Sequence, residues 1–286
     1  MKPWFFHAVV SLVLMGTQRF FYKVSAERQC NTAWTTFSFM ATVSVLSLVL
    51  FFALGSRIRD FSFLFVIALV NSGTFLTSAI AHMEALKEIP AGIAYPVIRL
   101  NAVLVVLFSL FYFHDPLSVC QGIGIVLALV VMATFARDLH GEQGQAGNVK
   151  RGFLLVCLSM LAGSMSSISS KFAAIHTDKM AFIALSYILS TLVSFGLRHR
   201  LQTRKASKNH RQAVIIGIGM GVLNLGGYYA FLQALSEGPL SVIASIAGMH
   251  FVIAVILATL IYKERLTPFR GIGIVLTIVS IILLRL

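Results

Sequence analysis

Short polar or turn-forming clusters divide the chain into long apolar segments, and this division constrains the fold more than any other feature. Each segment has about the 17–25 residues that an α-helix needs to cross the roughly 30 Å hydrocarbon core of a bilayer. The sequence therefore predicts an all-α, polytopic membrane protein with ten transmembrane helices. The segments lie near 4–22, 32–54, 62–81, 91–112, 118–136, 152–170, 180–197, 212–233, 240–262 and 270–285.

Composition supports the membrane class over a soluble one. Of the 286 residues, 58% are hydrophobic and 12% are charged, whereas soluble chains are about 45–50% apolar and about 25% charged. The net charge of +13 does not indicate nucleic-acid binding, because the basic residues lie in short segments between apolar runs. Cys30, Cys120 and Cys157 are far apart and lack metal-ligand spacing, so neither a metal nor a cofactor is predicted.

The second half of the sequence repeats the first. The phrase "GIGIVL" stands at 122–127 and again at 271–276, and 81–137 matches 230–286 without gaps at 15 of 57 positions. Each half holds five helices, and since five is odd, the second half enters the membrane from the opposite side. We therefore expect two inverted-topology repeats, 1–140 and 148–286, with a substrate site near the midplane between them.

Three stretches carry a resemblance to a known family: "ALKEIPAGIAYPVI" at 85–98, "ALSEGPLSVIASI" at 234–246 and "KERLTPFRGIGIVLTIVSIILL" at 263–284. With the five-plus-five repeat, they resemble the EamA-like members of the drug/metabolite transporter superfamily. The first half departs from this pattern at "HDPLS", 114–118. The resemblance implies a multi-pass exporter or exchanger of the bacterial inner membrane. It also implies a central cavity lined by the first, third and fourth helices of each half.

Polar side chains in the fourth and ninth predicted helices are the first candidates for substrate binding. Arg99 follows Tyr95 and Pro96 inside an apolar segment, where a charge is costly and therefore indicates function. The alternative is a structural arginine bound to the carbonyl that Pro96 frees. Asn101 lies near mid-helix, and the 149-residue offset pairs it with His250, which can exchange a proton near neutral pH. Helix packing is the competing explanation for both.

Further candidates lie on the other inner helices. Asn71 and Asn224 occupy the midpoints of the third and eighth helices, and Tyr228 can stack on a ligand or bond to it. Lys171 ends the sixth helix as Lys23 ends the first, at an offset of 148. Both lysines, with Gln18 and Arg19, are interpreted as basic mouths of the cavity, or as side chains that extend to the lipid headgroups.

No Asp or Glu lies in the middle of a predicted helix, which favours an anionic or zwitterionic substrate over a cationic drug. No HExxH, GxSxG or paired-aspartate motif is present, so an enzyme is not predicted. We expect a secondary transporter for a small polar metabolite such as an amino acid or organic acid, working by alternating access. The alternatives are a flippase for an anionic lipid carrier and a non-transporting partner subunit.

The expected partners are the small-molecule substrate, the lipid bilayer, and a coupling proton or counter-substrate, with no nucleic acid; the protein is expected to be a monomer or homodimer. Two indications of the orientation of the protein in the membrane conflict. The face with both termini carries five Lys and Arg and the opposite face fifteen, which places the termini outside. The family resemblance places them in the cytoplasm.

Overall fold

The computed structural model describes residues 2–28, 30–88, 97–98, 100–138, 148–201, 210–263 and 268–286. Within these ranges the regular structure is helical, as the sequence predicted. The elements are α1 (Pro3–Glu27), α2 (Thr32–Ala53), α3 (Phe61–Glu88), α5 (Asn101–Phe108), the π-helical turn η1 (Ser109–Phe113), α6 (Val119–Asp138), α7 (Val149–His176), α8 (Lys179–Leu201), α9 (His210–Glu237), α10 (Leu240–Gly248), α11 (His250–Tyr262) and α12 (Pro268–Arg285).

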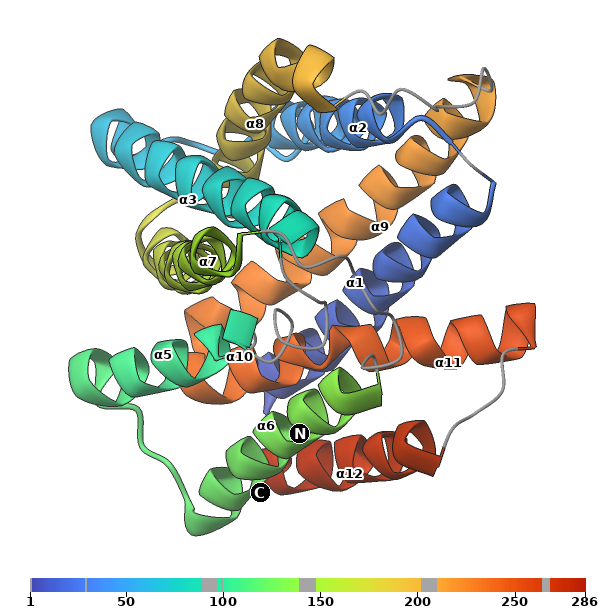
Figure 1. Cartoon of the computed structure of the whole chain (residues 1–286). Coiled ribbons are helices and arrows are strands. Elements are labelled where there is room, and N and C mark those ends of the chain that lie inside the picture. Colours follow the sequence, from blue (N-terminus) through green and yellow to red (C-terminus); the bar gives the residue numbers. More distant parts are fainter. Residues whose placement is uncertain are drawn as a thin grey trace.

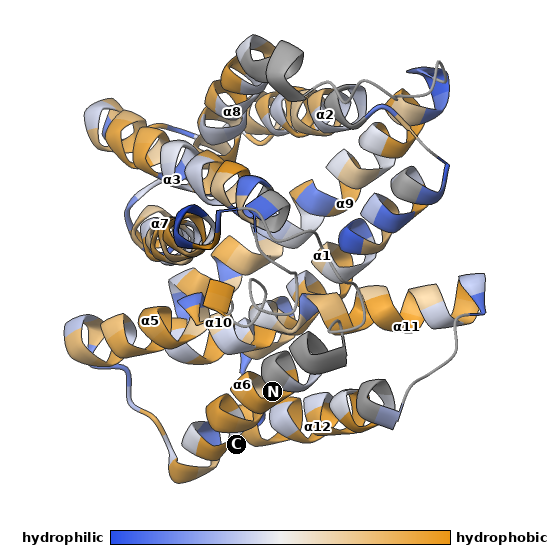
Figure 2. Ribbon diagram, in the orientation of Figure 1, coloured by the Kyte–Doolittle hydropathy of each residue, from blue (hydrophilic) through white to orange (hydrophobic). Residues whose placement is uncertain are grey.

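The outer surface of the helix bundle is apolar, as a lipid-facing surface must be. Phe111, Val119, Leu154 and Leu260 are each at least 70% exposed, and Figure 2 shows hydrophobic residues along most of the ribbon. Six segments in the described part of the chain are long and apolar enough to span a bilayer. The protein is therefore an all-α, multi-pass membrane protein. The six segments are 34–53, 61–82, 149–176, 179–196, 210–237 and 240–262.

The helix contacts follow the two-fold relation that an inverted repeat requires. The most extensive contacts are those of α3 with α7 and of α1 with α9, and exchanging the two halves converts one pair into the other. The pairs α2 with α8 and α6 with α12 are each converted into themselves. Figure 1 shows α6 and α12 together at one edge of the molecule and α2 and α8 at the opposite edge.

Individual residues obey the same relation. The ammonium of Lys171 lies 5.6 Å from the centre of the Phe113 ring, and that of Lys23 lies 5.6 Å from the centre of the Tyr262 ring. Phe113 and Tyr262 are 149 positions apart. The residue after each ring has a left-handed backbone conformation, with φ 51° at His114 and 53° at Lys263. The repeat found in the sequence is thus a repeat of three-dimensional structure.

The predicted ninth helix, 240–262, is broken. The segment α10 ends at Gly248, Met249 has φ −84° and ψ 5°, and α11 begins at His250. The His250 Nδ1 lies 2.6 Å from the Ala247 carbonyl oxygen, so the imidazole binds the backbone at the break. No proline marks this point, which is why the sequence predicted one continuous helix. Of the predicted fourth helix, 91–112, residues 91–96 and 99 lie outside the described residues.

The repeated phrase "GIGIVL" lies on the two peripheral helices. Gly124 of α6 packs against Leu284 of α12, and a Cβ at Gly124 would stand 2.9 Å from the Leu284 Cγ. Ser280 of α12 donates a hydrogen bond of 2.8 Å to the Gly124 carbonyl oxygen. A side chain at Gly124 would push the helices apart, so this glycine is a packing residue.

Candidate functional site: a polar cavity between the two halves

A cavity of about 230 Å³ lies between the helices of the two halves. Helices α1, α3, α5, α7, α9, α10 and α11 line it, as the family resemblance implied for the first, third and fourth helices of each half, and α2 and α8 contribute as well. The described polar residues of the lining are Gln18, Arg19, Tyr22, Asn71, Ser72, Asn101, Ser166, Ser167, Ser170, Ser186, Tyr187, Ser190, Asn224, Tyr228 and His250.

Five of the predicted binding residues meet in this cavity: Asn71, Asn101, Asn224, Tyr228 and His250. They are brought together from four different helices, α3, α5, α9 and α11. Lys171 does not line the cavity. Arg99 and Tyr95 lie outside the described residues.

Asn71 is bound into a hydrogen-bond network between α3 and α7. Its Nδ2 donates to the carbonyl oxygen of Ser166 at 2.9 Å and lies 2.9 and 3.1 Å from the hydroxyls of Ser169 and Ser170. The Tyr228 hydroxyl lies 2.9 Å from the Ser170 hydroxyl and donates to the Asn71 Oδ1 at 3.4 Å. Asn71 is therefore fixed by the protein, which satisfies a polar group that lipid could not.

Asn224 is held in one orientation by a residue that the sequence analysis passed over. The Tyr187 hydroxyl of α8 donates a 2.5 Å hydrogen bond to the Asn224 Oδ1. The Asn224 Nδ2 makes no hydrogen bond to another described residue, although the side chain is only 6% exposed. Its two N–H donors are thus available to a solute in the cavity.

Asn101 and His250, which the repeat pairs, are each the first residue of a helical segment, α5 and α11 respectively. Small residues on neighbouring helices allow these starts to lie close to the cavity. A Cβ at Gly163 would stand 3.2 Å from the Asn101 Nδ2, and a Cβ at Gly16 would stand 2.5 Å from the His250 carbonyl oxygen.

Arg19 supplies the one full positive charge among the described lining residues. It stands on the face of α1 that also presents Met15, Gln18 and Tyr22 to the cavity, as the 3.6-residue helical period requires. Arg19 and Tyr22 are both exposed, so the cavity reaches the surface beside them. No carboxylate occurs among the described lining residues. The cavity wall is therefore neutral to positive.

The sequence also matches the model of a family of transporters. The model of the EamA-like transporter family matches residues 2–136 and 150–286, which is nearly the whole chain and includes both repeats. The chain belongs to the EamA-like transporter family. Its members are membrane transporters, not enzymes, and the cavity between the repeats is the candidate transport site of this EamA-like protein.

Known proteins are similar to this chain in sequence or in fold. An uncharacterized protein of Haemophilus influenzae is 26% identical over 187 residues, which cover 64% of this chain and 62% of that protein. The probable 4-amino-4-deoxy-L-arabinose-phosphoundecaprenol flippase subunit ArnE of an Enterobacter species is 33% identical over 45 residues, or 16% of this chain and 42% of ArnE. A protein of known crystal structure superposes with a TM-score of 0.80 at 15% identity, over 100% of this chain and 99% of that one.

Helix α8 is the part of this EamA-like cavity that sequence reasoning missed. Ser186, Tyr187 and Ser190 of α8 line the cavity, and the Ser186 hydroxyl is buried without a hydrogen-bond partner in the described part of the chain. The signal was present in "SYILS", 186–190, where polar residues four apart share one helix face. In a membrane helix, such a face indicates contact with protein or water.

Lys171 has a structural role and does not line the cavity. Its Nζ donates to the carbonyl oxygens of Leu235, at 2.6 Å, and Gly238, at 2.8 Å, where α9 ends. Close by, Asp115 accepts hydrogen bonds from the Ser241 backbone N–H at 3.0 Å and the Ser241 hydroxyl at 2.8 Å. The lysine thus satisfies the end of α9, and the aspartate satisfies the start of α10.

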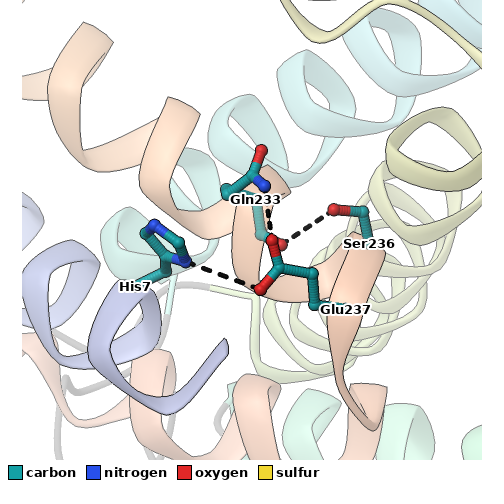
Figure 3. Close-up of polar contacts among 4 residues, drawn as sticks. All are labelled: His7, Gln233, Ser236 and Glu237. Carbon is teal, nitrogen blue, oxygen red and sulfur yellow. Dashed lines mark hydrogen bonds and ion pairs between the residues drawn. The ribbon is translucent and has the colours of Figure 1, made fainter. Parts of the chain in front are cut away.

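The start of α1 meets the end of α9 in a second polar cluster, shown in Figure 3. His7 Nδ1 lies 3.8 Å from Glu237 Oε2, and Gln233 Nε2 donates to Glu237 Oε1 at 2.5 Å. Beside them, a Cβ at Gly238 would meet the Trp4 ring, 2.5 Å from its Cγ. Since Arg19 lies 12 residues, or about 18 Å of helix, further along α1, this cluster lies far from the exposed mouth.

Proposed function

We propose that this EamA-like protein is a secondary transporter of a small anionic or zwitterionic metabolite in the bacterial inner membrane. The observation that carries the proposal is the cavity between the repeats. Its described wall holds hydroxyls, amides, an imidazole and one guanidinium, and no carboxylate. Such a wall offers donors to an anionic group and no countercharge to a cation.

The size of the cavity supports a small solute. At about 230 Å³, it lies below the range of about 300–1,000 Å³ that is typical of sites for drug-sized ligands. An amino acid or short organic acid fits this space, whereas the headgroup and chains of a lipid carrier need a much larger opening.

Alternating access is supported by the way the two halves interlock. Helix α7 contacts both α3 and α5, and its equivalent α1 contacts both α9 and α11, so each group is joined by the first helix of one half. The repeat exchanges these groups. A movement of one group against the other would close the mouth beside Arg19 and open the end beside His7 and Glu237.

A second candidate function, a subunit of a lipid flippase, is favoured by one observation. The ArnE segment that matches this chain comes from a probable flippase subunit, and the exposed Arg19 and Tyr22 would suit a phosphate headgroup at a lateral opening. A flippase predicts dependence on a long-chain lipid phosphate, which a solute transporter does not need.

Uptake by proteoliposomes tests the proposal. The purified protein would be reconstituted and offered labelled amino acids, mono- and dicarboxylates, and matched amines, with protein-free liposomes as control. We expect saturable uptake of at least one carboxylate-bearing solute and none of the amines. If no solute moves, and a labelled polyprenyl phosphate crosses the bilayer instead, the flippase function replaces this one.

A further inference from the structure

The cavity walls contributed by α1 and α7 are related by the repeat but differ in charge. At the offset of 148, Ser166, Ser167 and Ser170 are the equivalents of Gln18, Arg19 and Tyr22, and all six line the cavity. The first half therefore presents an amide, a guanidinium and a phenol where the second half presents three hydroxyls. The cavity has a basic side and a neutral, hydroxyl-rich side.

The charge of Arg19 has no counter-ion among the described residues. Its guanidinium lies 5.6 Å from the centre of the uncharged Tyr22 ring. An arginine stays protonated in proteins and presents its donors as a planar fork that matches a carboxylate. An uncompensated guanidinium against a cavity thus favours an anion brought in from outside.

Two amide side chains in the same cavity lining have unused hydrogen-bonding groups. Gln18 is 3% exposed and Asn224 is 6% exposed, and both line the cavity. The Gln18 side chain and the Asn224 Nδ2 make no hydrogen bond to another described residue. Buried polar groups are normally hydrogen-bonded, so these amides indicate a ligand that completes them.

From these observations we propose that the transported solute binds in one orientation, with a carboxylate at Arg19 and an uncharged polar end at the serines of α7. Gln18 and Asn224 donate to the same carboxylate or to the group next to it. This inference rests on the proposed transport function and names the residue that selects the solute. Arg19 is the charge-selecting residue, and the serine wall accepts hydroxyl or amine groups without a countercharge.

The repeat supplies the variants that test this orientation. Arg19→Ser places on α1 the residue that stands at the equivalent point of α7, and Arg19→Lys keeps the charge but loses the planar fork. Lys23→Ser is the matched control, because it removes a positive charge one turn further along α1 and outside the cavity lining. Uptake and thermal stabilisation would be measured with L-lactate against L-lactamide, glycolate against glycolamide, and inorganic phosphate.

We expect wild type and Lys23→Ser to prefer each carboxylate over its amide by at least tenfold in half-saturation concentration. Arg19→Ser should lose that preference, and Arg19→Lys should retain part of it, while all variants keep a monodisperse elution profile. If Arg19→Ser transports the carboxylates as well as wild type does, Arg19 is not the binding residue although the transport function stands. Stabilisation by phosphate alone would replace the carboxylate with a phosphate ester, and a wild type that moves none of the probes would contradict the transport function itself.

Discussion

At the scale of single residues, the Tyr187–Asn224 hydrogen bond determines which groups Asn224 presents to the cavity. The Asn224 amide could face the cavity with either its oxygen or its nitrogen. Because the Tyr187 hydroxyl donates to the Asn224 Oδ1, the N–H groups are the ones presented. This orientation agrees with a wall built for negative charge.

Removing the hydroxyl tests its role. Tyr187→Phe should raise the half-saturation concentration for the transported carboxylate by about twofold to tenfold, because a neutral hydrogen bond contributes about 0.5–1.5 kcal/mol net. Tyr229→Phe is the control, since Tyr229 neighbours the cavity residue Tyr228 but does not line the cavity. Transport kinetics check this prediction, and equal values for both variants would show that Tyr187 does not orient the site.

Sequence reasoning singled out five polar residues that line the cavity, Asn71, Asn101, Asn224, Tyr228 and His250. Each was conspicuous as a polar group inside an apolar segment. For the basic residues Arg19 and Lys171, the sequence left two positions open, a cavity mouth or the lipid headgroups. Whether Arg19 faces a cavity and Lys171 a helix end depends on side-chain direction and on neighbours distant in sequence.

At the scale of elements, a close helix crossing brings α9 against α2. Gly217 of α9 packs on the backbone of α2, and a Cβ there would stand 2.7 Å from the Thr35 carbonyl oxygen and 3.0 Å from the Phe39 N. Gly219, two residues on, has only the Phe21 Cε1 at 3.9 Å. The spacing of these glycines predicted close packing, but the sequence could not tell which one makes the contact.

The two glycines therefore respond differently to the same substitution. Gly217→Ala should destabilise the protein by about 1–3 kcal/mol, as overpacking does, because α2 backbone cannot move aside as a side chain can. Gly219→Ala should leave the apparent melting temperature in detergent unchanged or slightly raised. Melting curves of the two variants check this, and a lower melting temperature for Gly219→Ala than for Gly217→Ala would contradict the observed crossing of α9 and α2.

The break between α10 and α11 is the element that the sequence could not predict. Sequence patterns reveal helix breaks mainly through proline, and the residues around Met249 include none. The break is stabilised by a side chain–backbone contact, from His250 to the Ala247 carbonyl, and by the room that Gly16 leaves on α1. Both depend on tertiary structure.

At the scale of the whole molecule, the inverted repeat accounts for the symmetry of the fold. The repeat was visible in the sequence through its constant offset, and it determines the helix pairs, the position of the cavity and the paired helix starts at Asn101 and His250. The cavity departs from that symmetry where α1 and α7 differ in charge. Under the proposed transport function, the symmetry of the repeat allows two equivalent conformations. The difference in charge between α1 and α7 allows the solute to bind in one orientation.

Solute protection of a cavity cysteine tests this account most directly. Ser167→Cys would be placed in a background without Cys30, Cys120 and Cys157, with Leu161→Cys on the exposed apolar face of α7 as control, and treated with a membrane-impermeant maleimide. We expect labelling of residue 167 from the face at which α1 ends, and loss of that labelling when the transported carboxylate is present, with residue 161 unlabelled throughout. Labelling of residue 167 that is the same with and without the solute would contradict the claim that the cavity between the repeats is the transport site.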